Sequence, residues 1–392
     1  MAKSHNEIMN LKDNYNFIAN LMQTLFSLII LNIKMLIYKI FFKKKIFFFY
    51  HPVNTLNRIH TNYIEDLFNN VGKKIVLFFA CQPHNKFKLG SNYYFIKQGF
   101  LRWVFNADIF ISLYVCDVFT NHSVRIFMHH SIYDTPLVSK KNEKILLNRL
   151  SKYDHIFLSS KQTFTVFTEL FKINLNLKKP SLHEVGYPHL DYLIRRKRIV
   201  KKKKVVIIAP TGFKSFPDLT IQKYISKIIY FFIKFKKYKV IYRPHPSNVK
   251  ETKILNIEKK FRNNPYFMLD TSSDYFKVYK ESNFLITDLS GTAYTYALLT
   301  NNPVIFFSRN ENYINKTHYK KLNYFKNRKK IGIIIYKTKQ LKSAINKIEN
   351  NRHKYSNSIN NIRKKIIYLG KSKKRINYLL GCLVSGRRLR KL

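Results

Sequence analysis

The stretch FLITDLSGTAYTYALLTNNPVIFFS, residues 284–308, has the pattern of a strand, a tight turn, a helix and a second strand. Residues 284–287 form a short apolar run typical of a buried strand, and Asp288 ends that run. After the turn, apolar residues recur at helical spacing until Asn301-Asn302-Pro303 stops the helix, and residues 304–307 form the second strand. The simplest structure with this order is a parallel βαβ unit.

The turn of this unit carries Ser290, Gly291 and Thr292. In a parallel sheet such a turn lies outside the carboxyl end of a strand and at the N-terminus of a helix. Free N–H groups and the helix dipole favour an anion at that place. Two interpretations fit the stretch by itself: Asp288 and Ser290 cap the helix, or the turn binds a phosphate.

The composition indicates a folded protein with an extreme positive charge. The chain has 392 residues, 46% of them hydrophobic, which is enough for two domains with cores of their own. Its net charge of +51 comes from 72 Lys and Arg against 21 Asp and Glu, and such a charge attracts nucleic acid, anionic membranes or phosphate-bearing substrates. The chain is also rich in Ile, Asn, Phe and Tyr, as expected of a genome rich in adenine and thymine. We therefore interpret most of the lysine as solvated surface and expect no specific nucleic-acid partner.

Three cysteines, Cys81, Cys116 and Cys382, fit neither a metal-binding spacing nor a disulfide framework, which favours a reducing compartment.

In the N-terminal segment, residues 1–49, apolar stretches alternate with basic residues. We expect an amphipathic helix on an anionic membrane surface, with a helix packed on the core or a spanning helix as alternatives. The uninterrupted apolar part is marginal for a span, which needs about 20 residues. A cleaved signal peptide is not expected, because the positive charge follows the apolar run.

Strand-like and helix-like segments alternate through the rest of the chain, which predicts parallel sheets covered by helices on both faces. The run RRKRIVKKKK at 195–204 is too cationic for a core, and a linker explains it better than a nucleic-acid patch. We expect α/β domains at 50–198 and 199–392, with the site in the cleft between them. The predicted strands are 75–80, 109–115, 124–128, 155–159, 205–209, 240–242, 267–269, 284–287, 304–307 and 331–336. The predicted helices include 92–105, 141–150, 161–171 and much of 341–379.

Two adjacent histidines, His129 and His130, follow the strand at 124–128. A neutral imidazole takes a proton from a hydroxyl near pH 7, which suits a general base. Neighbouring side chains at a strand end point in different directions, so we expect one of the two to face the cleft. The alternative is a histidine that only caps a loop.

A second candidate group, Arg243-Pro244-His245-Pro246-Ser247, follows the strand at 240–242. Two prolines fix the backbone around His245, and the planar guanidinium of Arg243 adds several N–H donors in a fixed geometry. Such a site suits a pyrophosphate whose charge grows as its bond to the transferred group breaks, although a structural turn is the alternative. Thr211 and Lys214 follow the strand at 205–209 in a similar place. No Walker motif, GxGxxG motif or metal-ligand cluster is present in the sequence, so we expect neither a metal nor a cofactor.

Five elements of the sequence, in their order along the chain, resemble the CDP-glycerol glycerophosphotransferase family, the teichoic-acid-type polymerases and primases. They are MHHSIYDTP at 128–136, GYPHLDYL at 186–193, APT at 209–211 with Lys214, Arg243 with His245, and ITDLSG at 286–291. The chain departs from the family at three places. Either His130 takes the place of the usual glycine after His129, or the motif is displaced and His130 is the base. Gly291 replaces a second serine, and Thr295 stands where an acidic residue is frequent.

This resemblance implies a GT-B architecture, with two Rossmann-like domains facing across a cleft. It implies metal-independent transfer of glycerol-phosphate, or a related polyol-phosphate or sugar, from a CDP-activated donor to a hydroxyl of a lipid-linked or glycan acceptor. His129 or His130 would deprotonate the acceptor, and Arg243 and His245 would stabilise the leaving phosphate. The donor would be bound by Thr211, Lys214, Asp288, Ser290, Gly291 and Thr292. The enzyme would work in cell-envelope polymer synthesis at the cytoplasmic face of the membrane.

Two alternatives remain from the sequence. One is a GT-B glycosyltransferase or epimerase that uses a sugar nucleotide. The other is a non-catalytic basic protein that binds nucleic acid or membrane, which explains the charge but leaves the strand-end motifs without a role.

Overall fold

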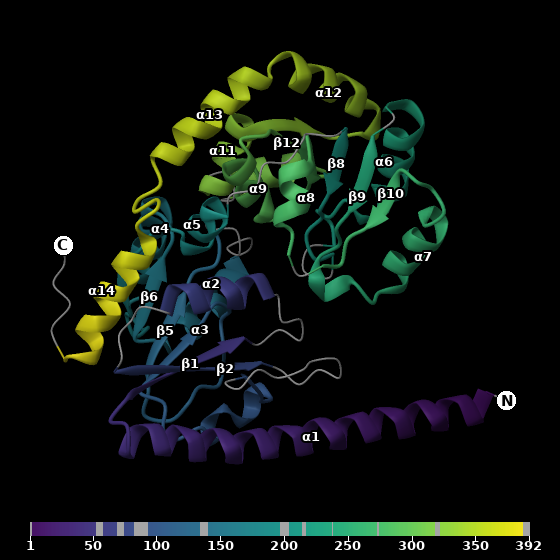
Figure 1. Ribbon diagram of the computed structural model, residues 1–392. Helices are drawn as coiled ribbons and strands as arrows, with labels where there is room; N and C mark the ends of the chain where they lie inside the picture. Colours follow the sequence, from purple (N-terminus) through teal and green to yellow (C-terminus); the bar gives the residue numbers. More distant parts are fainter. Residues whose placement is uncertain are drawn as a thin grey trace.

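Two parallel β-sheets, one from each half of the chain, form the framework of the protein (Figure 1). The computed structural model describes residues 2–51, 58–68, 74–81, 93–133, 140–196, 204–213, 217–236, 238–272, 274–317 and 322–386. Of residues 2–16, 58–62, 140–142 and 236, only the backbone is described.

The first sheet has seven parallel strands in the order β3-β2-β1-β4-β5-β6-β7. The strands are mostly buried, which explains their continuous apolar sequences. They are β1 (Lys45–His51), β2 (Ile75–Cys81), β3 (Tyr93–Phe95), β4 (Ile109–Ser112), β5 (Val124–Met128), β6 (His155–Leu158) and β7 (Ser181–Glu184). The helices of this half are α2 (Arg58–Phe68), α3 (Lys140–Leu150), α4 (Lys161–Ile173) and α5 (Pro188–Arg195).

The second sheet has six parallel strands in the order β10-β9-β8-β11-β12-β13. They are β8 (Val205–Ile208), β9 (Lys239–Tyr242), β10 (Phe267–Leu269), β11 (Phe284–Thr287), β12 (Val304–Phe307) and β13 (Gly332–Ile335). Its helices are α6 (Ile225–Phe231), α7 (Thr252–Phe261), α8 (Phe276–Glu281), α9 (Thr292–Thr300), α10 (Glu311–Lys316), α11 (Asn323–Ile331), α12 (Leu341–Asn350) and α13 (Arg352–Lys364). The predicted βαβ unit is confirmed as β11, α9 and β12, with the two strands paired in parallel. The strand order reverses between β8 and β11, where such sheets bind ligands.

Three strands of the first sheet were not predicted. β1 lies in the segment expected to be an N-terminal helix, yet it is an interior strand between β2 and β4. The lysines at 43–45 hide the change from helix to strand, because they continue the apolar and basic mixture of the helix. The segment 92–105, predicted as a helix, is instead β3 followed by a 3₁₀ helix, Gln98–Trp103. β7 is short and only partly buried, so it has little apolar pattern.

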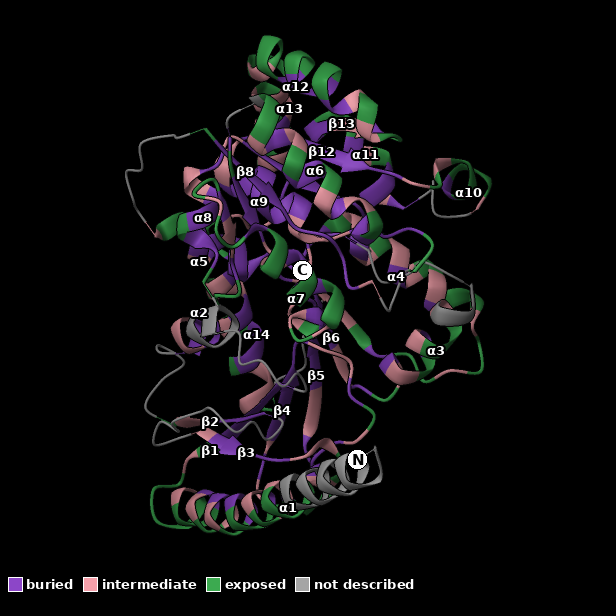
Figure 2. Ribbon diagram, turned by 90° about the vertical axis from the view of Figure 1, so that its right-hand side faces the viewer, coloured by how far each residue is buried: buried purple, intermediate pink, exposed green. Residues whose placement is uncertain are grey.

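The helix α1 (Ala2–Ile40) runs along the lower edge of the first sheet (Figure 1). Leu28, Leu31 and Met35 are buried against the sheet. The Asn32 side chain donates to the Trp103 carbonyl at 2.8 Å and accepts from the Phe105 N–H at 3.0 Å. The remaining face is exposed, and Figure 2 shows buried and exposed residues alternating around the helix. One face of α1 is therefore part of the protein core.

The last helix, α14 (Ser372–Val384), leaves the second domain and packs on the first (Figure 1). Ile376, Leu379 and Leu380 are buried there in the apolar cluster of β1, β4 and α2. Apolar residues of the C-terminal tail therefore cover the first sheet, although the tail follows the second sheet in the sequence. The predicted boundary near residue 198 lies outside the described residues.

The chain that crosses back to the first domain is held by the GYPHLD element. The Asp191 carboxylate accepts the Gly370 N–H at 2.7 Å and the Ser372 N–H at 3.1 Å, which caps the start of α14. Gly186 has a φ of +81°, and a Cβ there would lie 2.5 Å from Ser372 Oγ and 2.8 Å from the Ile367 carbonyl oxygen. Only glycine fits this backbone and this close approach.

We expect Gly186→Ala to lower the free energy of unfolding by about 1–3 kcal/mol, because it adds both backbone strain and a clash. Urea unfolding measures this change. Gly381→Ala is the matched control: Gly381 lies inside α14 with nothing within 4 Å of an added Cβ. This control should raise the stability by roughly 0.5–1 kcal/mol. Equal effects of the two substitutions would contradict the close packing at Gly186.

Candidate active site

The two adjacent histidines lie in different surroundings. His129 is 4% exposed, its Nδ1 lies 3.1 Å from Ser159 Oγ, and its ring packs near Phe127 and Phe167. Burial, with a smaller contribution from the neighbouring His130, lowers the pKa of His129 to about 3. His129 is therefore a neutral residue of the core.

His130 has the geometry of a base. Its Nδ1 lies 2.8 Å from the Leu113 carbonyl oxygen, which can only accept, so Nδ1 carries the proton and Nε2 keeps its lone pair. The ring is half-buried and stacks on Tyr114 with centroids 4.6 Å apart. Burial lowers the pKa of His130, the bond to Leu113 opposes this effect, and the charge of His245 lowers the pKa further. The imidazole is thus neutral near pH 7 and ready to accept a proton at Nε2.

His245 comes from the other domain and has the opposite arrangement. It follows β9, and its Nδ1 accepts the Ser247 N–H at 3.3 Å and lies 2.7 Å from Ser247 Oγ. With Nδ1 as the acceptor, Nε2 carries the proton of the neutral ring and is a donor. The side chain of His245 is exposed to solvent, and desolvation by the protein atoms around it lowers its pKa. The loop after β8 lies beside the ring, because a Cβ on Gly212 would lie 3.4 Å from Nδ1.

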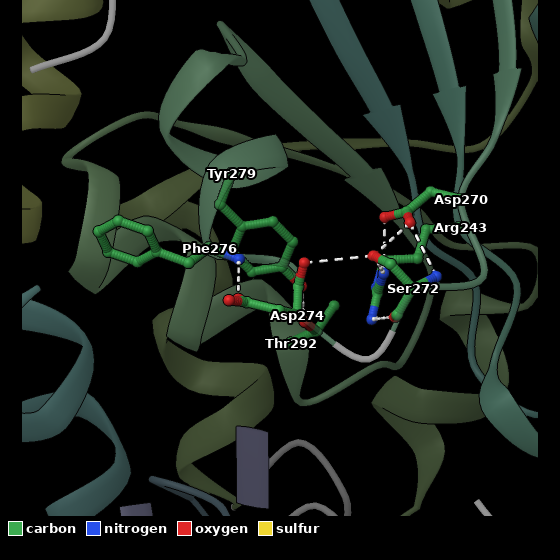
Figure 3. A network of polar contacts seen from close by, with 7 residues as sticks. All are labelled: Arg243, Asp270, Ser272, Asp274, Phe276, Tyr279 and Thr292. Carbon is green, nitrogen blue, oxygen red and sulfur yellow. Dashed lines mark hydrogen bonds and ion pairs between the residues drawn. The ribbon is translucent and has the colours of Figure 1, made fainter. Parts of the chain in front are cut away.

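Arg243 is bound to protein groups rather than directed freely at a ligand (Figure 3). Its Nη1 donates to Asp270 Oδ2 at 2.6 Å, and its Nη2 donates to the Ser272 carbonyl at 2.8 Å. The guanidinium also lies 5.3 Å from the centre of the Tyr275 ring. The side chains of Arg243 and Asp270 are only 11% and 5% exposed, so this is a buried ion pair that holds the ends of β9 and β10 together.

Asp288 points into the second domain and ties three backbone segments together. Its carboxylate accepts the Thr211 N–H at 2.8 Å, the Ile221 N–H at 2.9 Å and the Leu289 N–H at 2.6 Å. Burial raises the pKa of Asp288, and these three hydrogen bonds lower it. Both carboxylate oxygens therefore accept hydrogen bonds from backbone N–H groups. Asp288 contributes to the site by holding Thr211 and the turn after β11 in place.

The turn Ser290-Gly291-Thr292 lies between β11 and α9, as predicted. Ser290 Oγ accepts the Thr292 N–H at 3.4 Å, and its carbonyl accepts the Tyr324 hydroxyl at 3.1 Å. The Thr292 hydroxyl is hydrogen-bonded to Tyr279, as Figure 3 shows. The turn is only partly buried. The next N–H groups of α9 have partners within the turn: those of Ala293 and Tyr294 donate to the Ser290 and Gly291 carbonyls at 3.1 and 3.2 Å. Lys214 lies outside the described residues.

Of the predicted residues, the structure brings His130 close enough to His245 for one charge to affect the other, while His129 and Asp288 face the core of their domains. Sequence reasoning missed the groups that orient the two imidazoles, the Leu113 carbonyl and Ser247. Ser247 gave a weak signal, because it stands two residues after His245. The role of the Leu113 carbonyl could not be predicted, because every residue has a backbone carbonyl and its hydrogen bond does not depend on the residue type.

Comparison with known proteins identifies the family. The model of the family CDP-Glycerol:Poly(glycerophosphate) glycerophosphotransferase matches residues 111–380, more than half of the chain. The chain belongs to this family. A curated relative, the minor teichoic acid biosynthesis protein GgaB of Bacillus subtilis, is 24% identical over 239 residues. That alignment covers 55% of this chain and 24% of GgaB, so the chain spans about a quarter of the length of that relative.

Solved structures agree with the fold. The wall teichoic acid polymerase TagF has a TM-score of 0.61 at 17% identity, over 87% of this chain and 88% of that chain. The S. aureus MnaA–UDP structure has a TM-score of 0.60 at 12% identity, over 88% of this chain and 99% of that chain. The predicted family and the predicted two-domain α/β fold are both confirmed.

We expect the free energy of unfolding to fall as the pH is lowered from about 6.5 toward 4. Unfolded His129 binds a proton near its ordinary pKa of about 6.5, whereas in the folded protein its pKa is about 3 and it stays neutral. Such a histidine adds a slope of up to about 1.4 kcal/mol per pH unit. His189, with a pKa of about 3, acts in the same direction.

The variant His129→Asn removes one of these contributions, and asparagine can still bond Ser159. Its free energy of unfolding should depend less steeply on pH between 7 and 5 than that of the wild type. Urea unfolding at several pH values measures the slope. An unchanged slope would mean that His129 takes up its proton while the protein is folded.

Proposed function

We propose that this protein transfers glycerol-phosphate, or a closely related polyol-phosphate, from a CDP-activated donor to a hydroxyl acceptor during synthesis of a cell-envelope polymer. The observation that carries the proposal is a pair of imidazoles from the two domains that lie close enough for one charge to affect the other. His130 carries its proton on Nδ1, whereas His245 carries it on Nε2. Family membership supports the reaction class. The names of GgaB and TagF support teichoic-acid-like polymers, and one TagF structure was soaked with CDPG.

In the proposed reaction, Nε2 of His130 accepts the proton of the acceptor hydroxyl as its oxygen attacks the phosphorus that bears the glycerol. A new P–O bond forms to the acceptor, the P–O bond to the nucleotide breaks, and CMP leaves. The Nε2–H of His245 donates to the phosphate whose negative charge grows. The turn Ser290-Gly291-Thr292, at the positive end of the α9 dipole, binds the diphosphate.

The other predicted site residues act, in this proposal, on the loops that carry these groups. Asp288 holds the Thr211 loop, and that loop lies beside His245. Arg243 joins the ends of β9 and β10 and adds positive potential behind His245. His129 supports the His130 loop from the core side, and Lys214 is assigned to the donor by resemblance alone.

We expect His130→Asn to lower the rate of transfer by about 10²–10⁴-fold, because asparagine keeps the bond to Leu113 but has no Nε2. Release of CMP from CDP-glycerol measures the rate, and a thermal-shift titration measures donor binding, which should persist. The matched control is His122→Asn: His122 is exposed and has a φ of 55°, a conformation that asparagine adopts readily. Near wild-type turnover of His130→Asn would refute the assignment of the base.

A donor screen decides between the proposed reaction and the sugar-nucleotide alternative. CDP-glycerol and CDP-ribitol are compared with UDP-sugars and CMP-sugars in the same titration. A stabilisation confined to CDP compounds supports the proposal. A stabilisation only by UDP-sugars would favour the glycosyltransferase or epimerase instead.

We also propose that α1 docks the enzyme on an anionic membrane surface. Its outward face carries a row of large apolar side chains, each at least 40% exposed: Phe17, Ile18, Met22, Leu25, Phe26, Ile29, Ile33, Leu36, Ile37 and Ile40. Phe41 and Phe42 continue this surface, and exposed Lys43 and Lys45 follow it. An exposed apolar surface of this length needs a partner, and neighbouring lysines suit acidic headgroups.

The segment Phe17–Ile40 is long and apolar enough to cross a membrane, by length and composition alone. Its other face, however, packs on the first sheet, with Leu31 and Met35 fully buried. A helix held along the protein in this way fits a position in the membrane plane better than a span.

We expect the triple substitution Phe26→Ser, Ile29→Ser and Ile33→Ser to weaken partition onto anionic vesicles by on the order of 100-fold, because three apolar side chains leave the contact. Vesicle flotation measures the bound fraction. The control replaces Ile173, Leu175 and Phe235 by serine, since these are equally exposed but lie outside α1. Equal loss in both variants would contradict docking through α1.

A further inference from the structure

The hydroxyl of Tyr187 joins the two halves of the proposed site. Tyr187 lies between β7 and α5 and is 3% exposed. Its oxygen lies 3.2 Å from the carbonyl oxygen of His130 and 3.1 Å from Thr295 Oγ1 on α9. Because a carbonyl only accepts, the Tyr187 proton goes to His130, and the Tyr187 oxygen accepts from Thr295. One hydroxyl thus binds both the loop of the base and the helix behind the donor turn.

The same two segments also touch directly. Tyr133, three residues after His130, packs edge-on against Tyr294 of α9 with ring centres 4.6 Å apart. The Tyr294 hydroxyl donates to the Tyr324 carbonyl at 2.5 Å, and the Tyr324 hydroxyl donates to the Ser290 carbonyl at 3.1 Å. A continuous series of contacts therefore runs from the loop of the base to the donor turn.

The position of Tyr187 is itself tightly fixed. The preceding Gly186 lies against the crossover chain near Ser372, and the following Pro188 begins α5 at a position where its fixed φ suits a helix. A second bond between the domains, from Tyr275 to His189 Nε2 at 3.0 Å, lies close by. The hydroxyl of Tyr187 is therefore held at a defined place in the junction.

We propose that Tyr187 is a positioning residue that couples the orientation of His130 to the placement of α9, so that the base is aligned only when the donor turn is in its working position. The inference rests on the proposed function. It differs from simple packing between domains, because the aromatic ring supplies the packing and the hydroxyl alone supplies the two hydrogen bonds. Removing the hydroxyl should leave the donor site formed but the base misaligned.

The test compares four variants with the wild type: Tyr187→Phe, Thr295→Val, the double variant, and Tyr296→Phe. The last is the matched control, because Tyr296 is a buried tyrosine of the same helix whose hydroxyl accepts from Ser282 at 3.0 Å, without contact to the His130 loop. CMP release gives kcat and KM, and the thermal-shift titration gives donor binding.

We expect Tyr187→Phe to lower kcat by about 10- to 100-fold with donor binding within about twofold of wild type, since a small misplacement of a catalytic group has this effect on rate. Thr295→Val should lower kcat in the same way, and the double variant should be no worse than Tyr187→Phe, because both changes break one unit. Tyr296→Phe should keep its turnover. Multiplying effects in the double variant, or an equal loss in Tyr296→Phe, would overturn the coupling.

Amide hydrogen exchange tests the coupling without any substrate, and so separates it from the proposed reaction. Tyr187→Phe should speed exchange both at residues 130–133 and at residues 291–296, whereas Tyr296→Phe should leave 130–133 unchanged. Faster exchange on one side only would overturn the coupling even if the wild type transfers glycerol-phosphate. If the wild type releases CMP from no donor, the proposed function fails, and the exchange result still decides the coupling.

Discussion

The second domain depends on one buried carboxylate at the point where its strand order reverses. Asp288 is 2% exposed, and an ionised carboxylate so deep in the protein is costly unless it is hydrogen-bonded. Its three backbone N–H donors come from the loop after β8, from residue 221 and from the turn after β11. The two strand-end loops that meet at the switch point are thereby fixed to each other. His245 rests on one of these loops, and the donor turn begins at the other.

At the junction between the domains, too, a few residues make several of the contacts. The GYPHLD element supplies Gly186 for a close approach, Tyr187 for a bridge and Asp191 for a helix cap, within six residues. Around them, one apolar cluster continues from α1 and the first sheet to α9 and α11 of the second domain. An interface with a continuous apolar core resists relative motion more than a polar one does. The His130 and His245 loops are therefore held in a defined arrangement, although they come from domains folded around separate sheets.

Much of the fold could be predicted because each buried parallel strand has a recognisable local sequence pattern. The runs at 124–128, 284–287 and 304–307 are continuous and apolar, with turn residues on either side, and all three are strands. β1 was not predicted, because the lysines before it continue the pattern of the apolar helix. The hydrophobic periodicity therefore does not change visibly where the strand begins. The site was harder to predict. Whether His129 or His130 is open to the cleft depends on Ser159 and Leu113, which lie elsewhere in the sequence. The partner of Arg243 is Asp270, which directly follows the neighbouring strand of the sheet.

The pairing of the aspartates also explains how so basic a chain keeps its site suited to a diphosphate. Asp270 is paired with Arg243, Asp274 with Arg196, and Asp288 with backbone N–H groups. Their negative charges are therefore compensated locally and repel an incoming anion less than free carboxylates would. The remaining field is that of a chain with a net charge of +51, which attracts anions. The charge excess thus adds to the attraction of an anionic donor to the proposed site, whereas burial and the nearby His245 lower the pKa of His130.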